Sequence, residues 1–338
     1  TPHSSAWTYS HELGRRHLEQ TFPNEVTTVS YENITEKNIA SAMEEAIHAG
    51  CNIIFTTTPT FAQESLRAAI THPEVRILNC SLNTTHRYIR TYYTRMHEAK
   101  FLMGAIAGEM AENDKIVYIA DYPILGTIAQ INAFALGAQM TNPRAKVYLE
   151  WSTLIDQDIE KRIDEIDPNC ISGKDIIVPD DNNHFYGVYH RESGGGEQKN
   201  LAMPLCHWGK FYEELIRIIM AGNWEQDNDV EKAINYWWGM PTGVVDVICS
   251  KKLPAGTVRL VNVLKHNYKT GQFHTFTDQM YAQGHILKEK KGETLSPEEV
   301  IEMDWLAENI IGRIPKIEEL QEQAKPVLTQ QGIETRKG

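Results

Sequence analysis

Residues 115–151 decide the fold class of this chain. Three stretches follow one another there: KIVYIAD (115–121), TIAQINAFALGAQMTN (127–142) and AKVYLEW (145–151). The first and third are short, nearly continuous apolar runs, which are typical of strands that are covered on both faces. The second predicts a helix. A strand, a helix and a second strand in this order predict a βαβ unit of a parallel sheet.

The same alternation continues on both sides of this unit. Strands are predicted at residues 25–31, 51–58, 75–81, 174–181 and 200–208, and helices at residues 41–50, 61–74, 98–114, 155–166 and 210–222. Residues 182–200 predict a strand and a glycine turn, and residues 273–293 predict a small hairpin. Ser296, with Glu299 three residues later, is the pattern of a capping box at a helix start. We therefore expect an α/β protein.

The first residues break this order, because the chain opens on a predicted helix, TPHSSAWTYSHELGRR (1–16). A chain of βαβ units should open on a strand. We therefore expect residues 25–31 to be the second strand of a unit whose first strand lies upstream of Thr1.

Length and composition narrow the class of protein. The chain has 338 residues, which suggests two domains. A formal net charge of −12, from 33 basic and 45 acidic residues, argues against a nucleic-acid binder. No apolar run approaches the roughly 18 residues of a membrane span. The five cysteines form no CxxC pair, and their odd number fits a reducing compartment slightly better than an oxidising one.

Ligands of open parallel sheets bind at the carboxyl ends of the strands, so the residues at the predicted strand ends are the candidates for a binding site. Most of these residues are aromatic, hydroxyl or carboxylate side chains. They include Thr57, Thr58, Thr60, Phe61, Ser81, Asp121, Tyr122, Trp151, Asp180, Asp181, His207 and Trp208. This composition suits a flat, polar-edged ligand that is uncharged or cationic. No glycine-rich loop follows a strand and opens a helix, so a phosphate ligand is not expected.

Five of the candidates leave two interpretations open on sequence alone. Trp7 and Phe61 are each either a core residue or a ligand contact. Trp237 and Trp238 are adjacent, so in an extended segment they point in opposite directions, and one of them is available to a cleft. Asp246 lies in the apolar run 244–248 and needs a partner, which is either a ligand donor or a donor of the protein.

Enzyme signatures are absent from the sequence. It contains no GxSxG elbow, no P-loop and no HExxH motif. His97 beside Glu98, and His207 after Cys206, are the nearest approaches to a catalytic pair, but adjacency in sequence does not make a dyad. We therefore expect a binding protein without a catalytic residue, cofactor or metal.

Six stretches together resemble one protein family. They are AWTYSHELGRR (6–16), TRMHEAKFLMGAIAG (94–108), INAFALGAQMTNP (131–143), HWGKFYEELIRIIMAGNW (207–224), YWWGMPTGVVDV (236–247) and LSPEEVIEMDWLAENIIGRIP (295–315). In this order they resemble the basic membrane protein (BMP, PnrA-like) family, the substrate-binding proteins of ABC transporters. The resemblance implies a type I periplasmic-binding-protein fold: two doubly wound parallel-sheet lobes with a hinge and an interlobe cleft.

The resemblance also implies a division of the chain. The N-terminal lobe would comprise residues 1–114 and about 208–238, and the C-terminal lobe residues 115–207 and about 239–338. Hinge bending would be absorbed near residues 113–115, 207–209 and 239–243. Partners would be the small-molecule ligand and an ABC permease, with no nucleic acid and no insertion of this chain into a membrane. An extracytoplasmic location is implied, while a cytoplasmic one stays open because no leader is visible.

The family's ligands are mostly purine nucleosides or bases, with riboflavin in some members. Its ligand positions match Trp7, Phe61, Asn132, Trp208 and Asp246 of this chain. A purine would stack between Trp7 and either Phe61 or Trp208, with Trp238 also facing the cleft. Where the family usually has a carboxylate before the aromatic helix start, this chain has His3, Ser4 and Ser5.

Hydrogen bonds to the ligand are expected from a set of polar side chains, namely Ser4, Ser5, Thr58 and Asn132. Asp246 would accept from a sugar hydroxyl or from a ring N–H. Three alternatives remain: a riboflavin binder, an intracellular ligand-sensing domain that uses the same cleft, and an enzyme acting on a nucleoside-like substrate.

Overall fold

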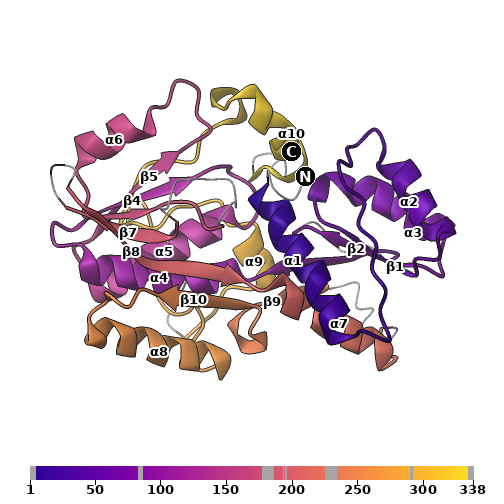
Figure 1. Cartoon of the computed structure of the whole chain (residues 1–338). Helices are drawn as coiled ribbons and strands as arrows, with labels where there is room; N and C mark the ends of the chain where they lie inside the picture. Colours follow the sequence, from indigo (N-terminus) through magenta and orange to yellow (C-terminus); the bar gives the residue numbers. More distant parts are fainter. Residues whose placement is uncertain are drawn as a thin grey trace. The chain divides into compact units, whose positions relative to one another are not determined.

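The computed structural model describes residues 5–82, 87–176, 186–192, 194, 196–224, 234–289 and 292–333. These residues divide into two compact units (Figure 1). Unit 1 contains Thr1–Thr94 and His207–Trp238, and unit 2 contains Arg95–Ile177, Asp181–Cys206 and Gly239–Gly338. Within the described part of the chain, no helix is both long and apolar enough to cross a membrane.

Unit 1 is built on a four-stranded sheet in the order β1-β2-β3-β9, in which every neighbouring pair is parallel. Its strands are β1 (Ile53–Thr56), β2 (Arg76–Cys80), β3 (Arg90–Thr94) and β9 (Tyr236–Trp238). Its helices are α1 (Ala6–Thr21), α2 (Ile39–His48), α3 (Ala62–Thr71) and α7 (Trp208–Met220), with a short 3-10 turn η1 (Pro59–Phe61) after β1. The alternation predicted from the sequence is confirmed for α2, β1, α3 and β2.

Two helices of unit 1, α1 and α7, pack closely against each other because glycines stand at the contact. A Cβ on Gly14 would lie 2.9 Å from the Tyr212 ring, and one on Gly209 would lie 2.7 Å from the His17 side chain. Side chains larger than hydrogen at these two positions would push the helices apart. This packing fixes the start of α1 relative to the sheet.

The predicted strand at residues 25–31 is wrong, because these residues make no ladder in the structure. β1 is the edge strand of its sheet and pairs only with β2. Val29 is 58% exposed, and the Thr28 hydroxyl is used by side chains of α1 instead. The segment is extended and apolar enough to suggest a strand, but it has neither a pairing partner nor a buried face among the described residues.

Unit 2 is built on a seven-stranded sheet in the order β10-β8-β7-β6-β4-β5-β13. Its strands are β4 (Lys115–Ala120), β5 (Lys146–Trp151), β6 (Cys170–Ser172), β7 (Val188–Arg191), β8 (Gln198–Cys206), β10 (Val245–Cys249) and β13 (Ile310–Ile311). Strands β6, β4, β5 and β13 pair in parallel, whereas β7, β8 and β10 extend the sheet by antiparallel pairing. The antiparallel half was not evident from the sequence.

Helices and short elements complete unit 2. They are α4 (Met96–Met110), α5 (Thr127–Thr141), α6 (Ile159–Ile166), η3 (Met240–Thr242), α8 (Ala255–Lys269), β11 (Met280–Ala282), β12 (Ile286–Glu289), α9 (Pro297–Ile301), η4 (Ile317–Glu319), η5 (Glu322–Ala324) and α10 (Lys325–Gln331). β11 and β12 form the predicted hairpin, and Ser296 with Glu299 forms the predicted capping box. Of the strand predicted at 174–181, only Lys174–Ile176 is described, and it contributes one isolated bridge.

Helices α4 and α5 make the closest helix contact of unit 2, again through glycines. A Cβ on Gly104 would lie 2.7 Å from the Phe134 carbonyl carbon, and one on Gly137 would lie 2.9 Å from the Ala105 nitrogen. The two helices therefore meet backbone to backbone. This contact groups residues 95–114 with unit 2, whereas the division implied by the sequence placed them in the first lobe.

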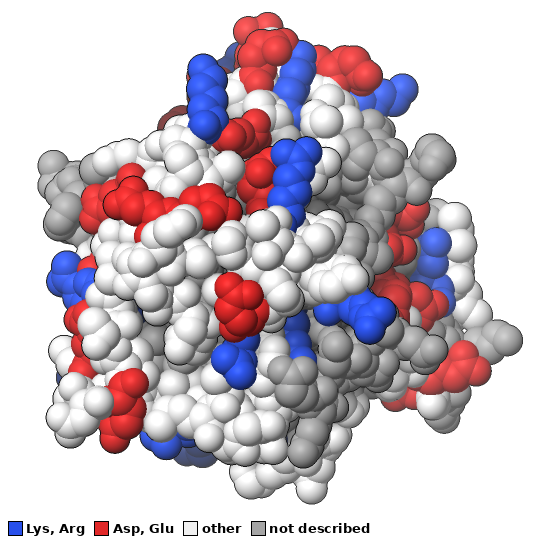
Figure 2. All heavy atoms as spheres, turned by 90° about the vertical axis from the view of Figure 1, so that its right-hand side faces the viewer, with Lys and Arg blue, Asp and Glu red and all other residues white. Residues whose placement is uncertain are grey.

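The face shown in Figure 2 carries acidic and basic side chains interspersed with each other. Neither sign forms a continuous region on this face. A basic stripe of the kind that binds a phosphate backbone is not present on it, in agreement with the overall charge of −12.

Candidate functional site

The start of α1 is fixed to the carboxyl end of the unit 1 sheet by Trp7. Its indole Nε1 donates a 2.6 Å hydrogen bond to the carbonyl of Thr57, the residue that follows β1. Ser5 caps the helix and accepts a bond of 3.3 Å from the Thr8 N–H. Trp7 and Ser5 therefore lie at the strand ends where a ligand is expected. Ser4 lies outside the described residues.

Trp7 is half-buried and has aromatic neighbours on several sides. Its ring centroid is 6.0 Å from that of Tyr93, with an interplanar angle of 25°, which is an offset stack. His11 and Trp208 meet it edge-on, at 4.8 and 5.6 Å. Since its N–H is already bonded, Trp7 offers a ligand π surface rather than a hydrogen bond.

Trp208, predicted to face the ligand, is a core residue of unit 1. It is 1% exposed, and its ring lies 4.2 Å from the His11 ring at 26°. His11 itself is 5% exposed and shares a hydrogen bond between its Nδ1 and the Tyr212 hydroxyl. Burial lowers the pKa of His11 to about 3, so this imidazole is neutral at neutral pH. No local pattern in the sequence indicated that His11 is a buried packing partner.

The loop after β1 contains Thr58 and Phe61, which were both predicted to contact a ligand. Thr58 caps η1: its Oγ1 accepts from the Thr60 N–H at 3.4 Å and lies 3.1 Å from the Thr60 hydroxyl. Phe61 packs against the core formed by α2, α3 and the sheet, which includes Ile39 and Met43. Packing therefore favours the core interpretation of Phe61, although its side chain is only half-buried, and the stacking of a ligand on Phe61 or Trp208 stays a prediction.

Trp238 ends β9 and is half-buried. Its ring packs 4.6 Å from Phe211 of α7 and 5.4 Å from Tyr236. Trp237 is half-buried as well. The side chain of Trp238 therefore supports the packing of α7 on the sheet.

In unit 2, Asn132 has a structural role. It is fully buried in α5, its Nδ2 donates to the Trp305 carbonyl at 2.7 Å, and its Oδ1 accepts from the Ala307 N–H at 2.8 Å. These bonds tie α5 to a segment more than 170 residues later. The amide of Asn132 is thus used within the unit, and its role as a ligand donor stays a prediction.

Asp246 has a protein partner in the structure. Its carboxylate lies 2.8 Å from Lys265 Nζ of α8 and accepts a 2.7 Å bond from the Val247 N–H. Burial opposes its ionisation, but the hydrogen bonds and the Lys265 charge outweigh burial and lower the pKa of Asp246. The side chain is 35% exposed, so it is paired without being closed off from solvent.

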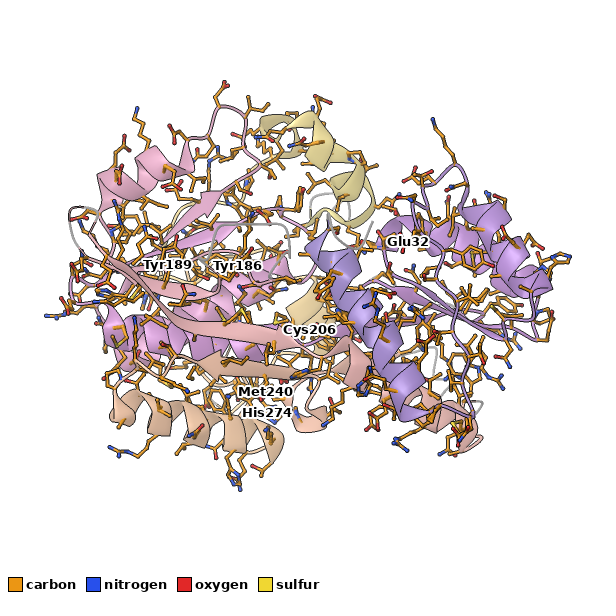
Figure 3. All side chains as sticks on the ribbon, viewed as in Figure 1. Glu32, Tyr186, Tyr189, Cys206, Met240 and His274 are labelled. Carbon is orange, nitrogen blue, oxygen red and sulfur yellow. The ribbon has the colours of Figure 1, made fainter. Side chains whose placement is uncertain are left out.

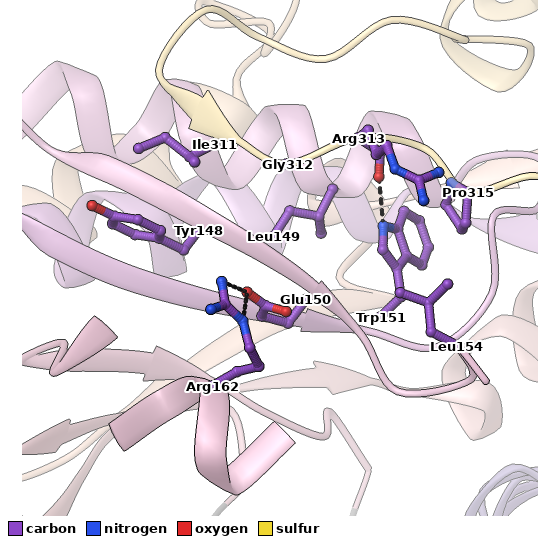
Figure 4. Close-up of a pocket in the computed structure, with 10 residues that line it drawn as sticks. All are labelled: Tyr148, Leu149, Glu150, Trp151, Leu154, Arg162, Ile311, Gly312, Arg313 and Pro315. Carbon is purple, nitrogen blue, oxygen red and sulfur yellow. Dashed lines mark hydrogen bonds and ion pairs between the residues drawn. The ribbon is translucent and has the colours of Figure 1, made fainter. Parts of the chain in front are cut away.

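A small pocket lies beside β5 in unit 2 (Figure 4). Its volume is about 220 Å³, below the range of roughly 300–1,000 Å³ of most ligand pockets. Glu150 in its wall is paired with Arg162, and the Trp151 indole donates to the Arg313 carbonyl. Because these polar groups already have partners, the pocket does not present an obvious ligand site.

The described residues bear on two reactive arrangements, a metal site and the adjacent pair His97–Glu98. No group of three or more His, Cys, Asp or Glu side chains there could hold a metal ion. Of the adjacent pair singled out in the sequence, His97 packs beside Phe276, while Glu98 accepts a hydrogen bond from the Met240 N–H. The pair is therefore not arranged as a dyad.

Comparison with known proteins settles the family. The family described as ABC transporter substrate-binding protein, PnrA-like, matches residues 1–194, which is more than half of the chain. The chain belongs to this PnrA-like family. The resemblance of the six sequence stretches is thereby confirmed.

PnrA-like relatives with curated names include a purine-binding protein of Brucella abortus. It is 24% identical over 331 residues, covering 93% of this chain and 91% of the relative. A protein of Haloferax volcanii, provisionally named an ABC transporter glucose-binding protein, is 25% identical over 254 residues, covering 70% of this chain and 62% of the relative.

Solved structures confirm the fold of this PnrA-like chain. A transcriptional activator of the comK gene from Bacillus halodurans aligns with a TM-score of 0.60 at 16% identity, covering 79% of this chain and 95% of the other. An ABC transporter solute-binding protein from Conexibacter woesei aligns with a TM-score of 0.56 at 11% identity, covering 81% and 95%. The chain thus has the α/β fold of solute-binding proteins.

Proposed function

We propose that this chain is a solute-binding protein that binds a purine nucleoside or base for ABC-type uptake. The observation that carries the proposal is the position of Trp7. It is a half-buried indole at the carboxyl end of a parallel sheet, and its N–H is already bonded to Thr57. An aromatic face anchored in this way suits a planar heterocycle. The name of the Brucella relative, which aligns along most of the chain, supports the same ligand class.

The energetic basis of the proposed binding is stacking plus burial. An offset aromatic pair contributes about 0.5–1.5 kcal/mol beyond the area that it buries. Tyr93 already holds Trp7 in a stacked arrangement, so little ordering is needed when a base arrives. The hydroxyls of Ser5 and Thr58 accept bonds from their own helices. The Ser5 hydroxyl can also donate one bond to an acceptor atom of the ligand, whereas Thr58 also shares a hydrogen bond with the Thr60 hydroxyl.

The wider role follows from the family. PnrA-like proteins deliver a small molecule to an ABC transporter and work outside the cytoplasm, and we propose both for this chain. We also propose that it binds without turnover, because the family that matches the chain is one of substrate-binding proteins.

A ligand panel tests the proposal. Purified protein is titrated calorimetrically with adenosine, guanosine, inosine, hypoxanthine, riboflavin and glucose, and each mixture is checked for turnover by chromatography. We expect saturable binding of at least one purine with no product. Binding of glucose or riboflavin alone would contradict the purine assignment, and conversion of a nucleoside would contradict the assignment as a binding protein.

A further inference from the structure

Two of the segments that join unit 1 to unit 2 leave unit 1 side by side. The chain passes from one unit to the other at Thr94–Arg95 and again at Trp238–Gly239. The strands that lead to these points, β3 and β9, are parallel neighbours, and Thr94 is paired in register with Trp238 as their last pair. On the unit 1 side, the two crossings are therefore joined by a backbone ladder.

On the unit 2 side, a single carboxylate joins them. Glu98, in the first turn of α4, accepts a 2.6 Å hydrogen bond from the Met240 N–H. Met240 begins η3, which packs on α8 and β10 (Figure 3). Glu98 is 4% exposed, and Arg95 Nε lies 3.1 Å from its other oxygen, without the geometry of a hydrogen bond. The Met240 bond is therefore the directional contact that Glu98 makes.

The Glu98 carboxylate occupies the space beside Gly239, the residue before Met240. A Cβ on Gly239 would overlap the Glu98 carboxylate, reaching 2.7 Å from its Cδ. The backbone of Gly239 also favours glycine, because its φ of −140° is combined with a ψ of −141°, which lies outside the β region of other residues. Glu98 cannot move aside without breaking its bond to Met240, so the two positions are matched to each other.

We propose that Glu98 is a positioning residue that joins the two crossings, Thr94–Arg95 and Trp238–Gly239, into one two-stranded hinge. Between the final ladder pair and the Glu98 bond lie only Arg95–His97 on one strand and Gly239 on the other. With both ends joined, the crossings bend together rather than separately, which limits the orientations open to the two units. The inference does not depend on which ligand binds.

A distance measurement on the ligand-free protein tests this hinge. One label is placed in each unit through a genetically encoded amino acid, at the exposed positions Ile70 and Val263, and the distribution of distances is recorded by pulsed electron resonance. We expect Glu98→Ala to broaden the distribution, whereas Glu98→Gln, which keeps an oxygen for the Met240 N–H, leaves it near wild type. A wild-type distribution in Glu98→Ala would overturn the proposal.

A mutant cycle separates this role from ordinary stability. Gly239→Ala should broaden the distribution by displacing the carboxylate, and the double variant Glu98→Ala/Gly239→Ala should be no broader than Glu98→Ala alone. Additive effects of the two changes would overturn the matched arrangement. Hydrogen exchange at the Met240 amide should accelerate at least tenfold in Glu98→Ala and Gly239→Ala, and unchanged exchange would contradict the bond.

If Glu98→Ala does not fold, the variant Glu98→Asp, with a shorter acidic side chain, still tests the proposal. Glu98→Asp retains the charge but withdraws the carboxylate by one methylene, so its distribution should also broaden. A folded Glu98→Asp protein with the wild-type distribution and wild-type exchange at Met240 would overturn the proposal. Because every readout uses the protein without ligand, failure of the hinge and failure of purine binding are observed separately.

Discussion

The predicted ligand residues of the two units differ in burial and in how their hydrogen-bonding groups are used. In unit 1, Trp7 is half-buried and its one hydrogen-bonding group is satisfied by the Thr57 carbonyl, so its ring remains as a surface for a ligand. In unit 2, Asn132 is fully buried and its amide is used as both donor and acceptor within the unit. Trp7 and Asn132 were both candidates in the sequence, but they differ in which groups remain available to contact a ligand.

The comparison shows that hydrogen-bonding capacity separates a candidate binding residue from a structural one. An indole has one donor and two faces, so an internal bond to its donor does not use its faces, one of which is stacked on Tyr93 in Trp7. An amide has only its donors and acceptor, and internal bonds consume them. Asp246 is intermediate, since it is paired with Lys265 but still partly exposed. The predictions below test this ordering, from the largest expected effect to the smallest.

The largest effect is expected at Asn132. Asn132→Ala leaves the Ala307 N–H and the Trp305 carbonyl buried without their partner, which should lower the free energy of unfolding by about 2–4 kcal/mol. Urea denaturation followed by circular dichroism measures this loss. The control is Gln139→Ala, at a half-buried position on the same helix, which should change stability by less than about 1 kcal/mol. An Asn132→Ala protein that keeps wild-type stability but loses ligand affinity would reverse the assignment.

The buried imidazole beneath Trp7 should make unit 1 sensitive to acid. The pKa of His11 is lowered to about 3 from 6.5, so the unfolded state binds its proton first, and stability is complete above pH 6.5 and falls as the pH drops toward 3. Between pH 6.5 and pH 5 the loss should reach about 2 kcal/mol, at 1.36 kcal/mol per unit. His11→Gln should remove this part of the loss, as measured by urea denaturation at pH 7 and pH 5.

An exposed histidine provides the control for that experiment. His48→Gln on α2 makes the same substitution at an exposed position, and the effect of His11→Gln is compared with it. If His11→Gln and the wild-type protein lose stability equally on acidification, then His11 is not held neutral by its packing.

At Trp7 the expected effect is on binding. Trp7→Ala should weaken purine affinity at least tenfold, or about 1.4 kcal/mol, because the stacking surface is lost. Trp7→Phe keeps a smaller ring without the bond to Thr57 and should lose less. Calorimetric titration gives both values, and circular dichroism shows that each ligand-free variant is folded. An unfolded Trp7→Ala protein together with unimpaired binding by Trp7→Phe would mean that the ring serves the core.

The smallest effect is expected at Asp246. Asp246→Asn breaks a partly exposed ion pair with Lys265, which should cost less than about 1 kcal/mol of stability. If Asp246 accepts from a sugar hydroxyl, the same change weakens adenosine more than adenine. Parallel titrations with the two ligands measure the difference, and equal weakening would remove Asp246 from the sugar contacts.

Much of the fold could be predicted because its strands are local apolar patterns. β4 and β5 were found in this way, and the family resemblance gave the two-lobed class. Residues 25–31 failed because a strand also needs a neighbour, which the pattern cannot supply. β3 was missed because its sequence, RTYYT, mixes polar and aromatic residues whose burial depends on distant partners such as Asn235 and Tyr236.

The candidate site was predictable only in part, for a related reason. The position of Trp7 followed from the rule that ligand residues gather at strand ends. The structural role of Asn132 did not, because its partners Trp305 and Ala307 are more than 170 residues away. The bond from Met240 to Glu98 spans 142 residues and likewise left no local signal. Sequence pattern identifies which side chains are chemically capable, and long-range contacts decide which of them remain available.

The central claim is that unit 1 presents Trp7 to a purine. Native mass spectrometry of the protein purified under gentle conditions tests it most directly, comparing wild type with Trp7→Ala after incubation with an equimolar mixture of adenosine, hypoxanthine, riboflavin and glucose. The account predicts one purine bound to the wild-type protein and none to Trp7→Ala. A sugar or flavin bound in place of the purine, or the same purine occupancy in both proteins, would contradict it.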